Sequence, residues 1–148
     1  MKKHFPLFAL FIFLTACSPQ VDVAKAKQEM LQADRDMSAL AAKEGFNKAI
    51  YQYAADSIVK LDEGNYPIIG KKNYGDSFGE KIGPTTISWE PVHGEVAQSG
   101  ELGYTWGNWK FVQPDTTYFG NYFTAWKKDV DGKWKVMLDG GNEAPKPK

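Results

Sequence analysis

The sequence predicts an α+β fold, in which helices cover one face of a mostly antiparallel β-sheet. Two patterns support this prediction. In residues 28–43 and 46–54, apolar side chains recur at the three- and four-residue spacing of a helix with one buried face. After Thr85, turn-forming segments separate four stretches that are typical of strands, and all five tryptophans lie in this half. The chain therefore has a helical first half and a β-rich second half.

The first half is predicted to contain three helices and two short strands. The first helix ends before Gly45, because glycine commonly follows the last turn of a helix. The predicted elements are helices over 28–43, 46–56 and 72–81 and strands over 57–61 and 66–70. The second half is predicted to be an antiparallel meander with turns at 99–101, 113–116 and 129–133.

The first residues resemble the signal of a bacterial lipoprotein. Two lysines precede an apolar run over 5–14, which is too short to span a bilayer of roughly 30 Å as a helix. The run ends in "LTAC", which resembles the lipobox, whose cysteine, here Cys17, becomes lipidated. The resulting division is a signal peptide over 1–16, a tether over 17–27, a domain over 28–143 and a C-terminal tail over 144–148.

Ser18, rather than aspartate, follows the cysteine. In a Gram-negative host this favours the outer membrane, with the domain facing the periplasm. The alternatives are an ordinary secretion signal followed by a chance cysteine, and a buried apolar helix.

Composition excludes several kinds of partner and site. Basic and acidic residues number 18 each, and the only arginine is Arg35. Nucleic acid and anionic membrane surfaces need clustered cations, so we expect no nucleic acid and membrane contact only through the lipid anchor. The single cysteine excludes an internal disulfide, and with one of the two histidines in the leader a cysteine and histidine zinc site is nearly excluded. We expect no metal and no cofactor.

Several segments resemble the NTF2-like superfamily. They are "YAAD" before a strand, "WEPVHGEVAQSGELGYTWGNW" and "DGKWKVMLDGGN". They are most similar to its SnoaL-like group, also called DUF4440, over residues 28–142. The resemblance implies a cone, in which a strongly curved sheet wraps around helices and encloses a pocket, and a sheet surface that commonly forms dimers. The superfamily includes isomerases, dehydratases and cyclases, so the fold does not settle the function.

The ketosteroid isomerases of this superfamily offer one chemistry that can be checked by position. Counted from Tyr53 of "YAAD", the position of their catalytic aspartate is Leu61, which cannot accept a proton. The neighbouring Asp62 could replace it only if the strand were offset by one residue. The first helix also lacks the tyrosine that donates to the oxyanion in those enzymes. The resemblance therefore does not extend to this isomerase chemistry.

The segment "GYTWGNWKF" carries tryptophan on both faces of its predicted strand. Tyr104, Trp106 and Asn108 point to one side, and Trp109 points to the other. Aromatic rings on both faces need shelter, either from a partner subunit or from a cavity that holds a ligand. The predicted lining of such a pocket is Tyr53, Tyr104, Trp106, Asn108, Tyr122 and Trp126. The alternative is that the rings form only the helix-facing core and a homodimer interface.

Two carboxylates are candidate acid–base groups. Asp34 lies at the border of the apolar stripe of the first helix, and Asp139 lies in "VMLDGG", near the expected pocket mouth. Burial against the tryptophans would raise the pKa of either group and suit it to act as a general base. The alternatives are a solvated Asp34 that pairs with Arg35 or nearby lysines, and an Asp139 that only ends a strand.

Three classes of function fit these patterns. The first is a lipid-anchored periplasmic domain that binds a small, largely apolar molecule without transforming it. The second is an enzyme that uses one pocket aspartate for proton transfer, hydration or hydrolysis. The third is a non-catalytic dimeric interaction module.

Overall fold

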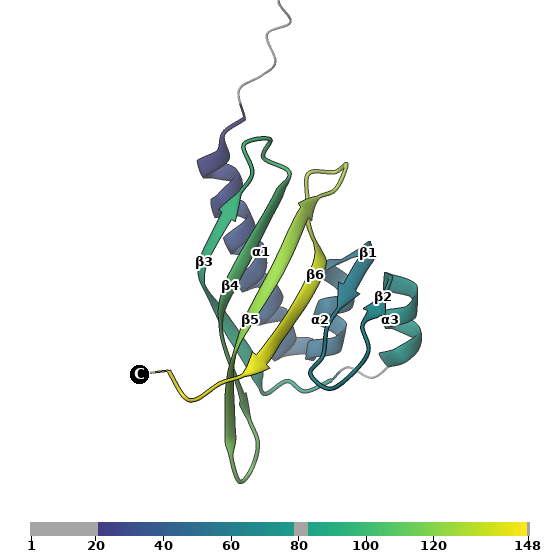
Figure 1. Ribbon diagram of the computed structural model, residues 1–148, viewed down its shortest axis with the longest axis vertical. Coiled ribbons are helices and arrows are strands. Elements are labelled where there is room, and N and C mark those ends of the chain that lie inside the picture. The colour runs from purple at the N-terminus through teal and green to yellow at the C-terminus, as the bar shows by residue number, and fades with distance from the viewer. Residues whose placement is uncertain (1–20, 79–82, 148) are drawn as a thin grey trace, which may run out of the picture.

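The computed structural model describes residues 21–78 and 83–147, and it confirms the α+β fold (Figure 1). The elements in chain order are α1 (Val23–Glu44), α2 (Phe46–Tyr53), β1 (Ala54–Lys60), β2 (Ile68–Ile69), α3 (Lys71–Phe78), β3 (Ile87–Val96), β4 (Leu102–Val112), β5 (Thr117–Lys128) and β6 (Trp134–Glu143).

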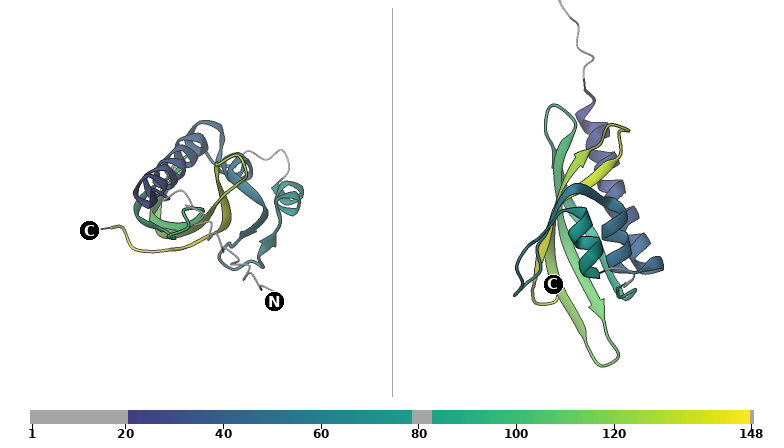
Figure 2. Two further views of the ribbon diagram at one scale, coloured as in Figure 1. Left: turned by 90° about the horizontal axis from the view of Figure 1, so that it is seen from above. Right: turned by 90° about the vertical axis from the view of Figure 1, so that its right-hand side faces the viewer.

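The six strands form one sheet in the order β2-β1-β6-β5-β4-β3. All neighbouring strands are antiparallel except β1 and β6, which run parallel. The sheet is curved, and α1 and α2 lie on its concave side (Figure 2). Helix α1 packs mainly on β3, and α3 packs beside β1. The predicted four-stranded meander and its three turns are confirmed as β3 to β6.

Helix α1 begins earlier than the predicted start at Gln28. The Asp22 side chain caps the helix by accepting a hydrogen bond from the Lys25 backbone N–H at 2.9 Å, so the helix begins at Val23. Its end at Gly45 agrees with the prediction, and this glycine has a φ of 96°. The described part of the predicted tether is therefore largely helical.

The second and third helices also differ from their predicted bounds. Helix α2 ends at Tyr53, because Ala54 already pairs with Val136 of β6 as the first residue of β1. Helix α3 spans Lys71–Phe78, and its predicted end at Lys81 lies outside the described residues.

The predicted signal peptide over 1–16 and the predicted lipidation site at Cys17 also lie outside the described residues. Within residues 21–78 and 83–147, no helix has the length and apolar character needed to cross a membrane.

Two glycines in the meander make room for aromatic rings on the concave face. Gly107 of β4 pairs with Tyr122 of β5, and Trp109 of β4 pairs with Gly120 of β5. A Cβ on Gly107 would overlap the Glu90 carbonyl oxygen and crowd the Tyr122 ring, and a Cβ on Gly120 would overlap the Trp109 indole. Each ring therefore covers the glycine on the neighbouring strand.

Replacing Gly120 with alanine is expected to lower the free energy of unfolding by about 2 kcal/mol, because the added methyl group overlaps both the Trp109 indole and the Asn142 backbone. Chemical denaturation followed by circular dichroism measures this change. Gly75→Ala in α3 is the matched control. There the added Cβ meets only the movable Tyr51 ring at 3.0 Å, and helix propensity improves by roughly 1 kcal/mol. Wild-type stability of Gly120→Ala would contradict this account.

Candidate functional site

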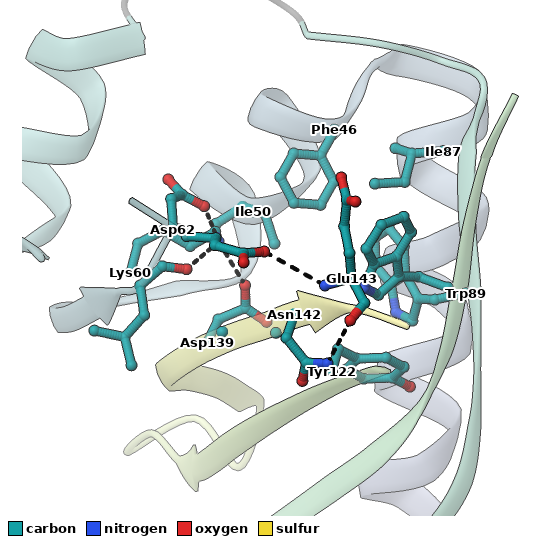
Figure 3. A pocket seen from close by; sticks show the side chains of 15 residues that line it. Phe46, Ile50, Lys60, Asp62, Ile87, Trp89, Tyr122, Asp139, Asn142 and Glu143 are labelled. Carbon is teal, nitrogen blue, oxygen red and sulfur yellow. Dashed lines mark hydrogen bonds and ion pairs between the residues drawn. The ribbon is translucent and has the colours of Figure 1, made fainter. Parts of the chain in front are cut away.

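A cavity of about 280 Å³ opens between the end of β1, the start of β3 and the last residues of β6 (Figure 3). Ligand pockets typically measure roughly 300 to 1,000 Å³, so this one suits a small molecule. We call its ring-bearing side the aromatic wall, formed by Phe46, Trp89, Trp109 and Tyr122. We call its ionisable side the polar patch, formed by Lys60, Asp62 and Asp139.

The aromatic wall is assembled from four elements. Phe46 begins α2, and Trp89, Trp109 and Tyr122 come from β3, β4 and β5. The Trp89 ring meets Phe46 edge to face at a centroid distance of 5.8 Å and Tyr122 at 6.4 Å. Such contacts add roughly 0.5 to 1.5 kcal/mol beyond the burial of their surface. Trp89 therefore joins Phe46 and Tyr122 into one cluster of rings.

Asp34 of α1 is fully buried behind the aromatic wall. One carboxylate oxygen accepts a hydrogen bond from Trp89 Nε1 at 2.8 Å, and the other accepts from the Tyr122 hydroxyl at 2.9 Å. One turn further along α1, the Ser38 hydroxyl donates to the Trp89 carbonyl oxygen at 2.8 Å and accepts from the Trp89 N–H at 3.0 Å. These bonds fix two rings of the wall from the side away from the cavity.

Burial raises the pKa of Asp34 above its ordinary value of 3.8, although hydrogen bonds from Thr105, Trp89 and Tyr122 oppose the rise. The solvated Asp34 considered above is wrong, and Arg35 pairs instead with Glu90 at 2.7 Å. Both Asp34 oxygens are engaged, and the rings separate them from the cavity. The geometry therefore gives Asp34 the position of a residue that holds the wall, not one that touches a ligand.

The polar patch joins β1 to β6. Lys60 Nζ lies 2.5 Å from Asp62 Oδ1 and 3.3 Å from Asp139 Oδ1, and the Thr124 hydroxyl donates to Asp139 Oδ2 at 2.8 Å. Lys60 and Asp139 are buried. Burial raises the pKa of Asp139, while the Lys60 ammonium and the Thr124 hydroxyl oppose the rise. Both Asp139 oxygens are thus engaged in the ion pair and the hydrogen bond.

The Lys60 ammonium keeps its charge despite its burial. Burial alone lowers the pKa of Lys60, but the carboxylates of Asp139 and Asp62 outweigh this effect and raise it above the ordinary value. Lys60 is therefore a charged, paired group and not a neutral amine that could act as a nucleophile.

The structure divides the six predicted lining residues between three places. Tyr122 lines the cavity. Trp126 is buried and Tyr53 is half-buried, and neither is among the described residues that line the cavity. Their rings meet edge to face at 6.2 Å, and Trp126 Nε1 donates to Thr105 Oγ1. The remaining three, Tyr104, Trp106 and Asn108, lie on the convex face of the sheet.

The register of β4 and β5 explains this correction. Even-numbered residues of β4 pair with odd-numbered residues of β5, so Tyr104 lies opposite Ala125 and Asn108 opposite Asn121. Asn121 Nδ2 donates to Asn108 Oδ1 at 2.8 Å on this convex face. Residues of equal parity on the two strands therefore point to opposite faces, and the predicted lining mixed the two.

The convex face is open in the single chain. The side chains of Tyr104, Trp106 and Phe123 are 46%, 40% and 42% exposed, and Trp106 and Phe123 are paired across β4 and β5. The rings on the concave face are therefore sheltered, as expected. Those on the convex face are not sheltered within one chain.

Sequence reasoning missed Phe46, Lys60, Trp89 and Trp109 as cavity residues. A usable signal for Trp109 was its shared parity with Gly107, since the glycines of this meander leave room for rings on the concave face. Asp62 was considered only for an offset strand. Because β1 ends at Lys60, Asp62 follows the strand and reaches the cavity without any offset.

No protein-family model matches the chain, and no curated protein matches it. Solved structures do share its fold. A ketosteroid isomerase-like protein from Erwinia carotovora atroseptica is 16% identical over 80% of this chain and 98% of its own, with a TM-score of 0.59. An NTF2-like protein with a cystatin-like fold from Novosphingobium aromaticivorans is 10% identical over 84% and 85% of the two chains, with a TM-score of 0.62.

A third similar structure is SalBIII, an epoxide hydrolase/cyclase-like enzyme with a role in pyran ring formation in the polyether salinomycin. It is 18% identical over 84% of this chain and 94% of its own, with a TM-score of 0.54. Identities of this size show a shared fold alone. The chain therefore has an NTF2-like fold, a class that includes proteins similar to ketosteroid isomerases and to cyclases.

Replacing Lys60 with methionine is expected to lower the free energy of unfolding by about 3 kcal/mol at neutral pH, because it leaves the buried Asp139 carboxylate without a cation. Urea denaturation measures the loss. Lys72→Met is the matched control, since Lys72 pairs with Asp76 on an exposed helix surface, and its effect on the free energy of unfolding should be much smaller than that of Lys60→Met. Equal effects of the two variants would show that the polar patch does not need its ammonium.

Asp34→Asn is expected to change how stability depends on pH. The raised pKa of Asp34 means that the folded state holds this proton more tightly than the unfolded state. Its stabilising contribution is complete below the ordinary value of 3.8 and is lost as the pH rises through the folded pKa. The free energy of unfolding of the wild type, minus that of the variant, should therefore fall as the pH rises above 3.8 and through the raised pKa of the folded state. Denaturation series at several pH values test this, and a difference that grows with pH contradicts it.

Proposed function

We propose that the chain binds a small molecule with an apolar body in the cavity of the cone, without transforming it. The observation that carries this proposal is a cavity with an aromatic wall whose rings are held from behind by Asp34 and Ser38. Rings that are already fixed lose little conformational entropy when a ligand binds, which favours affinity. Rings and other apolar groups supply most of the surface of the cavity, as in most small-molecule sites.

The proposal includes the cellular location inferred from the sequence. The domain is attached through a lipid on Cys17 to the outer membrane of a Gram-negative cell and faces the periplasm. The lipobox-like segment "LTAC" supports this part.

An enzyme that uses Asp139 is the second candidate. Asp139 lines the cavity, burial raises its pKa, and proteins of similar fold include a ketosteroid isomerase-like protein and an epoxide hydrolase/cyclase-like enzyme. A general base, however, needs an oxygen within reach of the substrate proton. Lys60 and Thr124 each engage one oxygen of Asp139, and both contacts stabilise the carboxylate and so weaken it as a base. Binding is therefore the better-supported function.

The proposal also includes a homodimer formed through the convex face of the sheet. The exposed rings of Tyr104, Trp106 and Phe123 support it, since burial of such a patch stabilises an interface. In the third candidate, the interaction module, this face is the only functional surface and the cavity remains without a ligand.

Binding is tested with 2-naphthylmethanol, a neutral probe with two fused rings, by isothermal titration calorimetry. The wild type should bind it, and Ile87→Trp should weaken the affinity at least tenfold, because Ile87 lines the cavity and a larger side chain would fill it. Val112→Trp makes a similar change at an exposed position outside the cavity lining and should leave the affinity unchanged. No binding to the wild type, or equal affinities in all three proteins, contradicts the proposal.

Native mass spectrometry of the full chain, purified from its own envelope, tests the remaining parts. The expected species is a dimer of acylated subunits that retains a small molecule. Trp106→Asp should give monomers, because it places a charge within the convex patch, whereas Tyr66→Asp, at a fully exposed loop position, should not. Unacylated subunits would exclude the lipid anchor, and a wild-type monomer would exclude the dimer.

A further inference from the structure

We propose that the cavity selects a small organic cation, an ammonium group on an aromatic or aliphatic body, over neutral and anionic molecules of the same shape. This inference rests on the proposed binding function and names the class of ligand. It depends on the charges around the cavity and on the aromatic rings that line it.

The charges that line the cavity are unequal in number. Among the described lining residues there is one ammonium, Lys60, and four carboxylates: Asp62, Glu63, Asp139 and Glu143. Lys60 is already compensated twice, by Asp62 at 2.5 Å and by Asp139 at 3.3 Å. The polar patch therefore carries excess negative charge before the carboxylates at the mouth are considered.

Glu63 and Glu143 form the mouth of the cavity. They come from the β1–β2 connection and from the last residue of β6, and the Glu143 N–H donates to a Glu63 carboxylate oxygen at 3.4 Å. Neither carboxylate lies within 4.0 Å of a basic group of the described residues, in contrast to Glu44, Glu90 and Glu95 elsewhere on the surface. Their charges therefore act on whatever enters the mouth.

The aromatic wall suits a cation for a separate reason. The face of an aromatic ring is negative, so it attracts an ammonium group within about 6 Å, most strongly when the ring is tryptophan. The cavity already contains one such contact, since Lys60 Nζ lies 5.8 Å from the centre of the Phe46 ring. Trp89 and Trp109 add two tryptophan rings to the lining of the same cavity.

The size of the cavity restricts the body of the ligand. At roughly 30 Å³ of liquid volume per water, about 280 Å³ corresponds to about nine waters. This space holds a one- or two-ring amine and excludes a steroid-sized molecule from full enclosure. An inorganic cation alone would leave the rings without a partner, so the site fits an organic ammonium best.

Three ligands with one ring system and different charges test the proposal: 2-naphthylmethylamine, 2-naphthylmethanol and 2-naphthoate. The full chain, in a non-ionic detergent matched in cell and syringe, is titrated with each ligand by calorimetry at low salt. At neutral pH the amine is protonated, and it should bind at least tenfold more tightly than the alcohol, with the carboxylate weakest. Raising the salt about tenfold should weaken amine binding and leave alcohol binding nearly constant.

The double variant Glu63→Gln, Glu143→Gln should reduce the affinity ratio of amine to alcohol at least threefold, because it removes the mouth charges and keeps the shape. Glu101→Gln is the matched control. It removes a charge from the exposed turn between β3 and β4, at the opposite end of the sheet from the end of β6, and should leave the ratio unchanged (Figure 1).

The outcomes separate this inference from the binding function. If the alcohol or the carboxylate binds as tightly as the amine, selection for a cation is overturned while the binding function stands. If the amine preference survives the double variant unchanged, the mouth carboxylates do not cause it and the inference is likewise overturned. If none of the three ligands binds, both are overturned.

Discussion

The arrangement of this protein depends on one buried carboxylate. Asp34 of α1 accepts hydrogen bonds from Trp89 of β3 and Tyr122 of β5, and so ties the longest helix to two strands of the sheet. A buried carboxylate costs several kcal/mol unless its oxygens are satisfied, so the site enforces one docking geometry of helix and sheet. The same two rings line the cavity. One interaction thus fixes both the closure of the cone and the shape of its interior.

Much of the fold could be predicted from sequence because its signals are local. Helical spacing, the glycine after α1 and the turns of the meander each lie within a few residues. The helix bounds were less predictable, since the cap by Asp22 and the pairing of Ala54 with β6 depend on single contacts. The curvature of the sheet into a cone was predicted from the resemblance to NTF2-like proteins and not from local patterns.

The site could be predicted only in part because it depends on long-range pairing. Asp139 and Tyr122 were expected at the pocket and do line the cavity, whereas Asp34, expected as a possible acid–base group, lies behind the aromatic wall. The faces of β4 and β5 were joined in the wrong combination, since alternation within a strand does not reveal the register between strands. The polar patch escaped prediction for the same reason. Lys60 pairs with Asp139 only because β1 and β6 are parallel neighbours in the sheet. These strands are far apart in the sequence, so no local pattern predicts their pairing.

The early start of α1 has a consequence for the orientation of the proposed lipoprotein. Only five residues separate Cys17 from Val23, so this connection spans roughly 22 Å at most. Helix α1 has 22 residues and extends roughly 33 Å before Phe46, which stands at the cavity. With the start of α1 held near the bilayer, the length of the helix can place the cavity away from the membrane surface. A ligand would then reach the cavity from the aqueous compartment and not by lateral diffusion out of the lipid.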